Sequence, residues 1–278
     1  MVAHSARVVR GLVAACHPGP TLVVTAAITG LALSLGRGPI GGLAVLLAVL
    51  SGQLSVGWAN DAYDSERDRQ SQRWDKPVVR GWVSERTLWV AAGTAAAACV
   101  PLSLLAGGVI GGTAHIVAVA SAWSYDLWLK TTPWSFVPYM VSFGLFVPFL
   151  TYGLTPPQPP ATWAVGTLSL LGLGAHLANG IPDIDSDRAT DSDGLVGRLG
   201  RRWSANLAVV ALLAATALLV GQLNLPGPTA AVILAGLAMV SVLAATAAGG
   251  RHLFTVVMLL ALTDALLHSV NASIIVAG

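Results

Sequence analysis

The chain has 278 residues, of which 55% are hydrophobic and only 10% are charged. A soluble globular domain carries about 25% charged residues, so a surface this poor in charge needs lipid around it. The composition excludes a soluble globular protein and a disordered chain. Two cysteines exclude a disulfide scaffold and a structural zinc site. A net charge of +2 gives no reason to expect a nucleic-acid partner.

Apolar runs long enough to cross a bilayer as helices, for which about 20 residues are needed, follow one another along the chain. They are continuously apolar rather than alternating, which favours helices over a barrel of strands. Their many Ala and Gly residues let helices pack closely in lipid and also permit an oligomer. We expect one all-α domain over 1–278, with about nine transmembrane helices around a central cavity. The expected spans are 19–36, 40–60, 87–107, 110–128, 134–153, 161–180, 204–223, 228–248 and 252–276.

The positive charges give an independent test of this layout. If the connecting segments alternate between the two sides of the membrane, every Lys and Arg except Arg37 falls on the same side as the N-terminus. The positive-inside rule makes that side cytoplasmic. Thirteen Arg against two Lys, in a chain rich in Ala and Gly, favour a bacterial source. We therefore expect a multi-pass protein of the bacterial inner membrane, with its N-terminus and active site on the cytoplasmic side.

Acidic residues gather in two clusters at the cytoplasmic ends of apolar runs. The first contains Asn60, Asp61, Asp64 and Asp68, and the second contains Asp183, Asp187 and Asp191 at four-residue spacing. On a helix, such spacing places the carboxylates on one face, where they repel one another unless a cation binds. Taken alone, each cluster could instead be an ordinary charged loop in contact with solvent.

The ligand type at these clusters indicates which cation would bind. Oxygen ligands without His or Cys suit Mg²⁺ or Ca²⁺. Mg²⁺ takes one or two carboxylates and fills its other positions with water and phosphate oxygens. Two facing clusters would therefore hold Mg²⁺ ions that bind a diphosphate. Lys76, Arg80 and Lys130 are candidate cations for the same diphosphate, although each also fits the role of a membrane anchor.

The motifs resemble those of a known family. Asn60-Asp61-x-x-Asp64-x-x-x-Asp68 resembles the first signature of the UbiA superfamily of intramembrane prenyltransferases, and Asp183-x-x-x-Asp187-x-x-x-Asp191 resembles the second. The Tyr125…Leu129-Lys130 and Lys76-Pro77…Arg80 elements are similar to further family features. The order of these elements and the nine expected spans agree with the family, so the resemblance covers nearly the whole chain.

The resemblance implies that two Mg²⁺ ions bridge the diphosphate of an isoprenoid substrate, whose tail lies in an apolar tunnel open to lipid. The prenyl group would pass to an acceptor such as an aromatic or other lipid-soluble nucleophile. We expect Asp64, Asp187, Lys130 and Tyr125 to be catalytic. The expected metal ligands are Asn60, Asp61, Asp64, Asp68, Asp183, Asp187 and Asp191.

Further residues are expected to bind the substrate. Aromatic side chains stabilise an allylic cation by cation–π contact, although Trp and Tyr are also common at membrane interfaces. Phe143 is a further candidate for this aromatic wall. The expected substrate-binding residues are Asn60, Lys76, Arg80, Lys130, Trp58, Trp123, Tyr139 and Asn179.

Three other functions compete with prenyl transfer. A membrane-embedded terpene cyclase on the same scaffold would use the same metal and diphosphate residues without an acceptor, and the sequence leaves this alternative open. A CDP-alcohol phosphotransferase needs a different arrangement of Asp on one segment. A transporter would place its charges near the bilayer midplane, whereas these clusters lie at the cytoplasmic rim.

Overall fold

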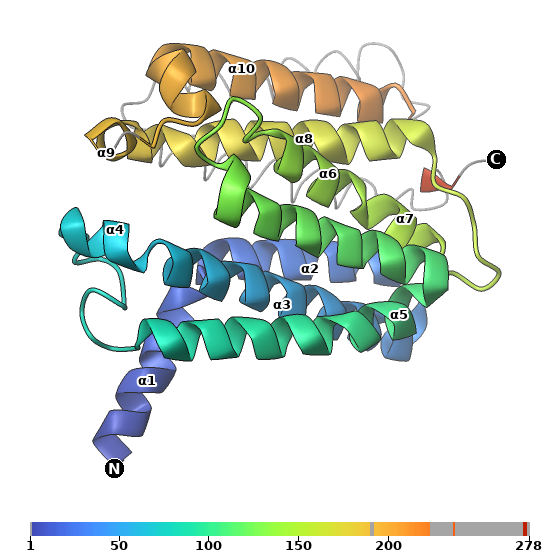
Figure 1. The fold of residues 1–278 in the computed structure, drawn as a ribbon. Helices are drawn as coiled ribbons and strands as arrows, with labels where there is room; N and C mark the ends of the chain where they lie inside the picture. Colours follow the sequence, from blue (N-terminus) through green and yellow to red (C-terminus); the bar gives the residue numbers. More distant parts are fainter. Residues whose placement is uncertain (1, 190–191, 223–235, 237–274, 277–278) are drawn as a thin grey trace.

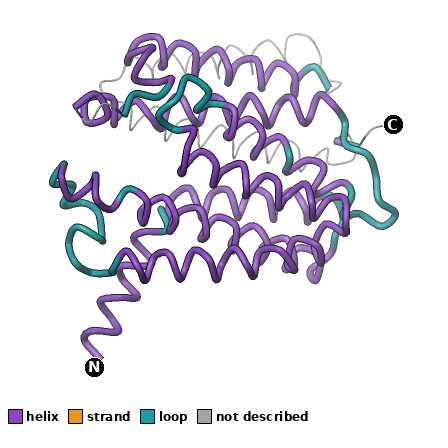
Figure 2. The backbone as a smooth tube through the Cα atoms, viewed as in Figure 1, coloured by secondary structure: helices purple, strands orange, loops and turns teal. Residues whose placement is uncertain are grey.

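The structure is a computed structural model that describes residues 2–189, 192–222, 236 and 275–276. Within these residues the regular structure is helical apart from an isolated bridge between Pro160 and Val276 (Figure 2). This confirms the predicted all-α class. The helices are α1 (Val2–Ala15), α2 (Pro18–Ser34), α3 (Gly38–Tyr63), α4 (Ser65–Gln70), α5 (Glu85–Ser124), η1 (Tyr125–Leu129), α6 (Val137–Gly144), α7 (Phe146–Thr151), α8 (Thr162–Gly180), η2 (Ile181–Asp183), α9 (Ile184–Ala189) and α10 (Leu195–Val220).

Four helical stretches of the described chain are long and apolar enough to cross a membrane: Gly38–Tyr63, Glu85–Leu129, Thr162–Ala189 and Leu195–Val220. A pair bent by 63°, Ser5–Ala15 with Pro18–Ser34, would make a fifth span, and Val137–Thr151 is a shorter apolar helix. The protein is therefore a multi-pass membrane protein. The predicted spans 228–248 and 252–276 lie almost entirely outside the described residues, so the count of nine stays a prediction.

The long stretch around α5 is a helical hairpin that turns at Gly108. This glycine has a positive φ of 65°, a conformation that other residues adopt only with strain. Ser103 Oγ lies 2.7 Å from His115 Nδ1, whereas a straight helix would hold these residues about 18 Å apart. A Cβ on Gly112 would lie 2.6 Å from the Ser103 carbonyl oxygen, so the two limbs touch through their backbones. The limbs correspond to the predicted spans 87–107 and 110–128.

Arg37, the basic residue predicted to lie alone on the outer side, has a structural role in this hairpin. Its guanidinium donates a hydrogen bond to the Ala106 carbonyl oxygen, at the end of the first limb. Cations are stabilising at the C-terminal end of a helix, where carbonyl groups lack helical partners. Burial lowers the pKa of Arg37. The position of this arginine is therefore explained by helix capping.

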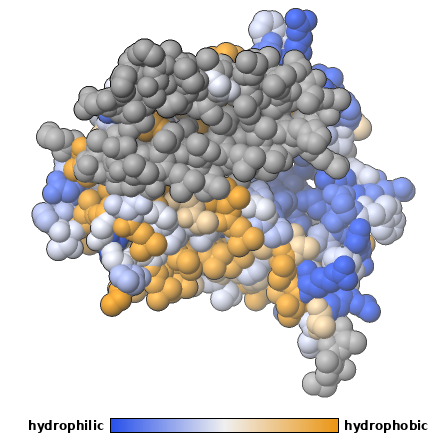
Figure 3. Space-filling model, turned by 180° about the vertical axis from the view of Figure 1, so that it is seen from behind, coloured by the Kyte–Doolittle hydropathy of each residue, from blue (hydrophilic) through white to orange (hydrophobic). Residues whose placement is uncertain are grey.

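The helices pack in two groups with a polar end in common. In Figure 1, α2, α3 and α5 lie on one side of the molecule, and α6, α8 and α10 lie on the other. Both α3 and the second limb of α5 run toward the end where α4 and α9 lie (Figure 1). Figure 3 shows polar residues gathered at that end and an apolar surface over much of the remaining described body. Exposed apolar side chains such as Leu22, Ile40, Val90 and Leu105 fit a lipid environment.

Candidate active site

A cavity of about 560 Å³ lies between the helix groups and is lined by residues of both acidic clusters. Its polar lining includes Asn60, Asp61, Asp64, Asp68, Asp183 and Asp187, together with Lys76 and Lys130. The structure thus brings together two groups of predicted site residues that are far apart in the sequence.

The first acidic cluster forms one wall because the chain stays helical across the end of α3. The Asp64 amide donates to the Asn60 carbonyl at 3.0 Å, and the Asp68 amide donates to the Asp64 carbonyl at 2.8 Å. These i to i+4 bonds stack Asn60, Asp64 and Asp68 one turn apart, as the sequence predicted. Asp64 and Asp68 are only 7% and 4% exposed.

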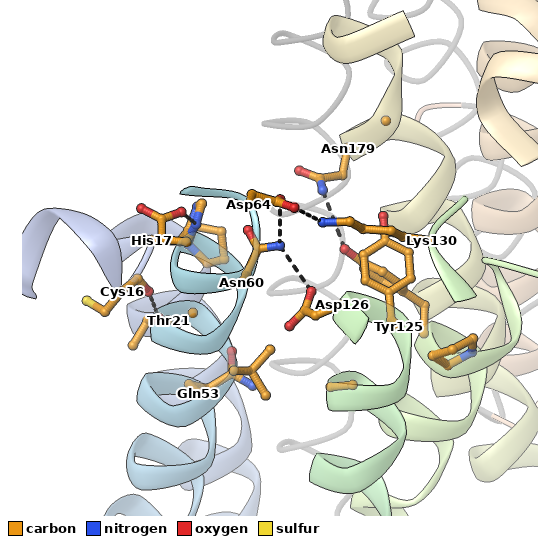
Figure 4. A pocket seen from close by; sticks show the side chains of 18 of the residues that line it. Cys16, His17, Thr21, Gln53, Asn60, Asp64, Tyr125, Asp126, Lys130 and Asn179 are labelled. Atoms are coloured by element: carbon orange, nitrogen blue, oxygen red, sulfur yellow. Dashed lines mark hydrogen bonds and ion pairs between the residues drawn. The ribbon is translucent and has the colours of Figure 1, made fainter. Parts of the chain in front are cut away.

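Asp64 makes contacts that connect the end of α3 with the segment after α5 (Figure 4). Lys130 Nζ donates to Asp64 Oδ1, and Arg67 Nη2 lies 3.0 Å from Asp64 Oδ2. The Asn60 amide reaches Asp64 Oδ2 at 3.5 Å and donates to Asp126 Oδ1 at 3.1 Å. Asp64 is therefore held beside cations from two different segments.

Asp61 belongs to the same cluster but contacts different residues, Lys76 and His17. Its Oδ1 lies 2.7 Å from Lys76 Nζ and 3.0 Å from His17 Nε2. Burial by itself lowers the pKa of Lys76, but the nearby carboxylates of Asp61 and Asp68 outweigh this effect, so the pKa of Lys76 is raised. Lys76 therefore carries a positive charge toward the cavity.

Arg73 links the segment that follows the first acidic cluster to the second cluster. Its Nη1 lies 3.3 Å from Asp183 Oδ1, and its Nη2 lies 3.1 Å from Asp75 Oδ2. The hydrogen bond with Asp75, with added attraction from Asp183, raises the pKa of Arg73. The segment after α4 and the segment after α8 thus meet at the cavity through one guanidinium.

The donor set fits a hard divalent cation that also binds an anionic ligand. Asp68 Oδ2 is buried and has no hydrogen-bond partner among the described residues. Burial raises the pKa of Asp68, and a cation beside this oxygen would favour its charged form. No group of three His, Cys, Asp or Glu side chains in the described chain is arranged as a complete metal cage. Mg²⁺ needs no such cage, because one or two carboxylates suffice when phosphate and water complete its shell.

A single wide turn places Tyr125, Asp126 and Lys130 together at the cavity. The Lys130 amide donates to the Tyr125 carbonyl at 3.0 Å, an i to i+5 bond that defines the π-helix η1. In an α-helix, residues five apart point about 140° away from each other. The π-turn removes most of that separation, and such turns are frequent at functional sites.

Beyond the carboxylates, the cavity lining becomes apolar and aromatic. The Tyr125 and Tyr139 rings meet edge to face with centroids 5.1 Å apart, and Asn179 Nδ2 lies 3.4 Å from the Tyr139 hydroxyl. All three residues line the cavity. The other residues of this region include Val24, Val56, Ala118, Val119, Phe143 and Phe146.

Three predicted substrate-binding residues lie outside the cavity lining, because each is engaged elsewhere. Arg80 donates to the Trp74 carbonyl and stacks 4.9 Å from the centre of the Trp82 ring. Trp58 Nε1 donates to the Leu12 carbonyl at 2.8 Å. Trp123 Nε1 donates to Ser55 Oγ at 3.2 Å. The predicted metal ligand Asp191 lies outside the described residues.

Several lining residues were not among the predicted site residues. Arg67 and Arg73 were interpreted only as part of the positive charge on one side of the membrane. Asp126 stands inside the Tyr125…Lys130 element, four residues before Lys130, and this spacing places the two residues on one helix face. Gln53 and His17 also line the cavity. A carboxylate next to Tyr125, inside an apolar run, was the signal available for Asp126.

Comparisons with solved structures show what the fold is similar to. A UbiA homologue from Aeropyrum pernix K1 matches with a TM-score of 0.64 and 19% identity, over 91% of this chain and 97% of its own. A UbiA homologue from Archaeoglobus fulgidus bound to DMAPP and Mg²⁺ gives 0.65 and 13%, over 92% and 98%. A structure of digeranylgeranylglyceryl phosphate synthase gives 0.64 and 15%, over 95% and 99%.

The family assignment rests on a match along the sequence. No curated protein matches the chain. The model of the UbiA prenyltransferase family matches residues 22–252, which is most of the chain and includes both acidic clusters. The chain belongs to the UbiA prenyltransferase family.

Proposed function

We propose that the protein is a Mg²⁺-dependent intramembrane prenyltransferase, which ionises an isoprenyl diphosphate and transfers the prenyl group to an acceptor. The observation that carries this proposal is that residues of both acidic clusters line one cavity, where Arg73, from the segment after the first cluster, pairs with Asp183 of the second. The cavity continues from these charges into an apolar and aromatic region. A diphosphate head matches the charged end of this cavity, and a hydrocarbon tail matches its apolar region.

The proposed metal ligands are the carboxylates of the two clusters with the amide of Asn60. Bound Mg²⁺ would neutralise the leaving diphosphate as a Lewis acid. The solved UbiA homologues bound to Mg²⁺ with DMAPP or with GPP support this choice of metal and substrate. The proposed ligands are Asn60, Asp61, Asp64, Asp68, Asp183 and Asp187, together with Asp191 from the sequence pattern.

The basic residues of the cavity are proposed to bind the diphosphate directly. Lys130, Arg67, Lys76 and Arg73 surround the two clusters at hydrogen-bonding distance from their carboxylates. Donors fixed beside the leaving group stabilise the negative charge that develops on it in the transition state. The carboxylates hold these cations in place, so little rearrangement is needed when the substrate binds.

The aromatic lining is proposed to protect the allylic cation. Tyr125, Tyr139 and Phe143 line the same cavity as the charged residues, and their rings would attract a cation and exclude water. The carbon–oxygen bond of the substrate breaks with its electron pair on the diphosphate. The acceptor then supplies the pair for the new bond and loses one proton to the diphosphate or to solvent.

The test is Mg²⁺-dependent release of diphosphate by the purified protein in nanodiscs. Prenyl diphosphates of 5, 10, 15 and 20 carbons would be supplied with Mg²⁺ or EDTA, and mass spectrometry would identify the products. We expect turnover with Mg²⁺ and none with EDTA. Release that is independent of Mg²⁺, or absent with every substrate and acceptor, would overturn the proposal.

Matched variants locate the chemistry in the cavity. Asp64→Ala and Asp187→Ala are expected to abolish Mg²⁺-dependent turnover while the protein still elutes as a folded species. Asp185→Asn is the control, because Asp185 lies between the proposed ligands Asp183 and Asp187 in sequence but is exposed and pairs with Arg201 at 3.3 Å. Near-normal activity of both alanine variants would contradict the metal assignment.

The same assay separates the transferase from the terpene cyclase. A transferase needs an acceptor for its product, whereas a cyclase yields a cyclic hydrocarbon or terpene alcohol from the diphosphate alone. We favour the transferase because digeranylgeranylglyceryl phosphate synthase is among the structures with this fold. We also propose that the charged end faces the cytoplasm of a bacterial cell, since fourteen of the fifteen basic residues belong to that side in the predicted layout.

A further inference from the structure

One buried carboxyl group of the cavity has no role in the function proposed above. Asp126 is 3% exposed, lies in the π-turn η1 and lines the cavity. Its Oδ1 accepts a hydrogen bond from Asn60 at 3.1 Å, whereas its Oδ2 is buried without a hydrogen-bond partner among the described residues. A buried polar atom without a partner is destabilising, so this oxygen indicates a missing ligand.

Asp126 lies between the charged end of the cavity and its apolar lining. The Asn60 amide contacts both Asp126 and Asp64 (Figure 4), and Asp64 is bound to Lys130 at the charged end. Asp126 precedes Lys130 by four residues, so it lies one turn farther from the charged end, toward Ala122 and the apolar lining. It therefore lies where the diphosphate region meets the region of the tail.

We propose that Asp126 binds a hydroxyl group of the prenyl acceptor, so that the acceptor is an alcohol or a phenol. This inference rests on the proposed transferase function. A nucleophile has to lie about 3–3.5 Å from the carbon it attacks, and a hydrogen bond to Asp126 would hold it beside the head of the prenyl chain. A hydroxyl both donates and accepts hydrogen bonds, so it pairs with the free oxygen whether or not the carboxyl carries a proton.

The geometry separates this role from that of the metal ligands. Asp61 and Asp64 of the first cluster contact Lys or Arg directly. Asp126 instead accepts its side-chain hydrogen bond from a neutral amide, that of Asn60. It comes from η1, whereas the clusters come from the ends of α3 and α8. A neutral, polar ligand fits this environment better than a second anion.

The experiment compares hydroxyl-bearing probes with their methyl ethers. The full chain in nanodiscs would receive geranyl diphosphate, Mg²⁺ and a panel of phenols, naphthols and glycerol monoethers, each beside its O-methyl ether. We expect prenylated products from at least one hydroxyl probe and none from the matching ether. The best probe then serves to measure the variants.

Two variants of Asp126 test the contact, and one variant is the control. Asp126→Asn, whose amide still pairs with a hydroxyl, is expected to lower kcat/KM for the hydroxyl probe by only about twofold to fivefold. Asp126→Leu is expected to lower it by about tenfold to a hundredfold, mainly through KM, as for loss of a hydrogen bond to a charged group. This loss should exceed any loss of acceptor-independent diphosphate release by at least tenfold. Asp185→Asn should change neither rate. Asp126→Asn keeps the shape of the side chain, and thus provides a folded variant if Asp126→Leu does not fold.

Each other outcome overturns the inference in a recognisable way. Equal use of the hydroxyl probe by the wild type and both variants would show that Asp126 does not bind it. Equal losses in transfer and in acceptor-independent release, with a higher Mg²⁺ requirement, would place Asp126 in the metal site. Transfer to the methyl ethers, or diphosphate release without transfer to any hydroxyl probe, would contradict the acceptor class. Absence of all Mg²⁺-dependent release would instead refute the proposed function itself.

Discussion

Arg73 Nη1 lies 3.3 Å from Asp183 Oδ1, so the segment that follows the first acidic cluster is bound to the second cluster, 110 residues later. The same guanidinium pairs with Asp75 in its own segment. Because both carboxylates and the arginine lie at the polar end of the cavity, a diphosphate entering there would meet a cation already held in place. The contact between Arg73 and Asp183 thus holds two distant segments together at the polar end of the cavity.

Removal of this cation is expected to weaken substrate binding. Arg73→Gln should raise KM for the prenyl diphosphate by about tenfold, since a charge-assisted hydrogen bond to the substrate is lost. Steady-state kinetics at several salt concentrations measure the effect, which should shrink as salt rises. The control is Arg69→Gln, because Arg69 pairs with Glu66 and Glu85 outside the cavity lining. An equal change in KM for both variants would refute a specific role of Arg73.

Lys130 is expected to act on the rate of the chemical step. Lys130→Met removes the cation that contacts Asp64 and should lower kcat by about a hundredfold to a thousandfold, as for loss of one fixed donor to a developing negative charge. Single-turnover measurement of diphosphate release separates this effect from product release. Lys130→Arg keeps the charge and should recover part of the rate. A change confined to KM would show that Lys130 contributes only to binding.

The close approach of the two limbs of the α5 hairpin at Gly112 predicts that a larger residue there destabilises the protein. A Cβ on Gly112 would lie 2.6 Å from the Ser103 carbonyl oxygen and 2.7 Å from Leu104 Cα. Gly112→Ala should therefore destabilise the protein by about 1–3 kcal/mol, the usual cost of overpacking, and lower its melting temperature. Gly93→Ala is the matched control in the same helix, because a Cβ there has no atom within 4 Å. Equal melting temperatures for the two variants would contradict the close approach of the limbs.

Trp123 tests whether an aromatic residue outside the cavity takes part in the reaction. Its indole donates to Ser55 Oγ and its ring lies 6.3 Å from the Trp89 ring. Trp123→Phe should cost about 0.5–1.5 kcal/mol of stability through the lost hydrogen bond and leave diphosphate release within twofold. Thermal melting and the release assay measure the two effects. A large loss of turnover at unchanged stability would show that Trp123 binds the substrate after all.

The sequence by itself determined the class of the protein and the chemistry of its polar motifs. Scarcity of charge excluded a soluble fold, because a chain must match the polarity of its solvent. Four-residue spacing predicted that Asn60, Asp64 and Asp68 share a face, since that relation depends only on the helix, and the structure confirms it. The chain's membership of the UbiA prenyltransferase family agrees with the resemblance of both signatures.

Tertiary structure decided which residues meet. Arg80 and Trp123 have suitable chemistry, but packing directs them to Trp74 and Ser55 instead of the cavity. Tyr125 and Lys130 share the site because one turn of helix is wider than the α-helical period, which local sequence patterns do not reveal. Contacts between distant segments depend on how whole helices pack, and the free energy of that packing is spread over many apolar side chains with no motif of their own.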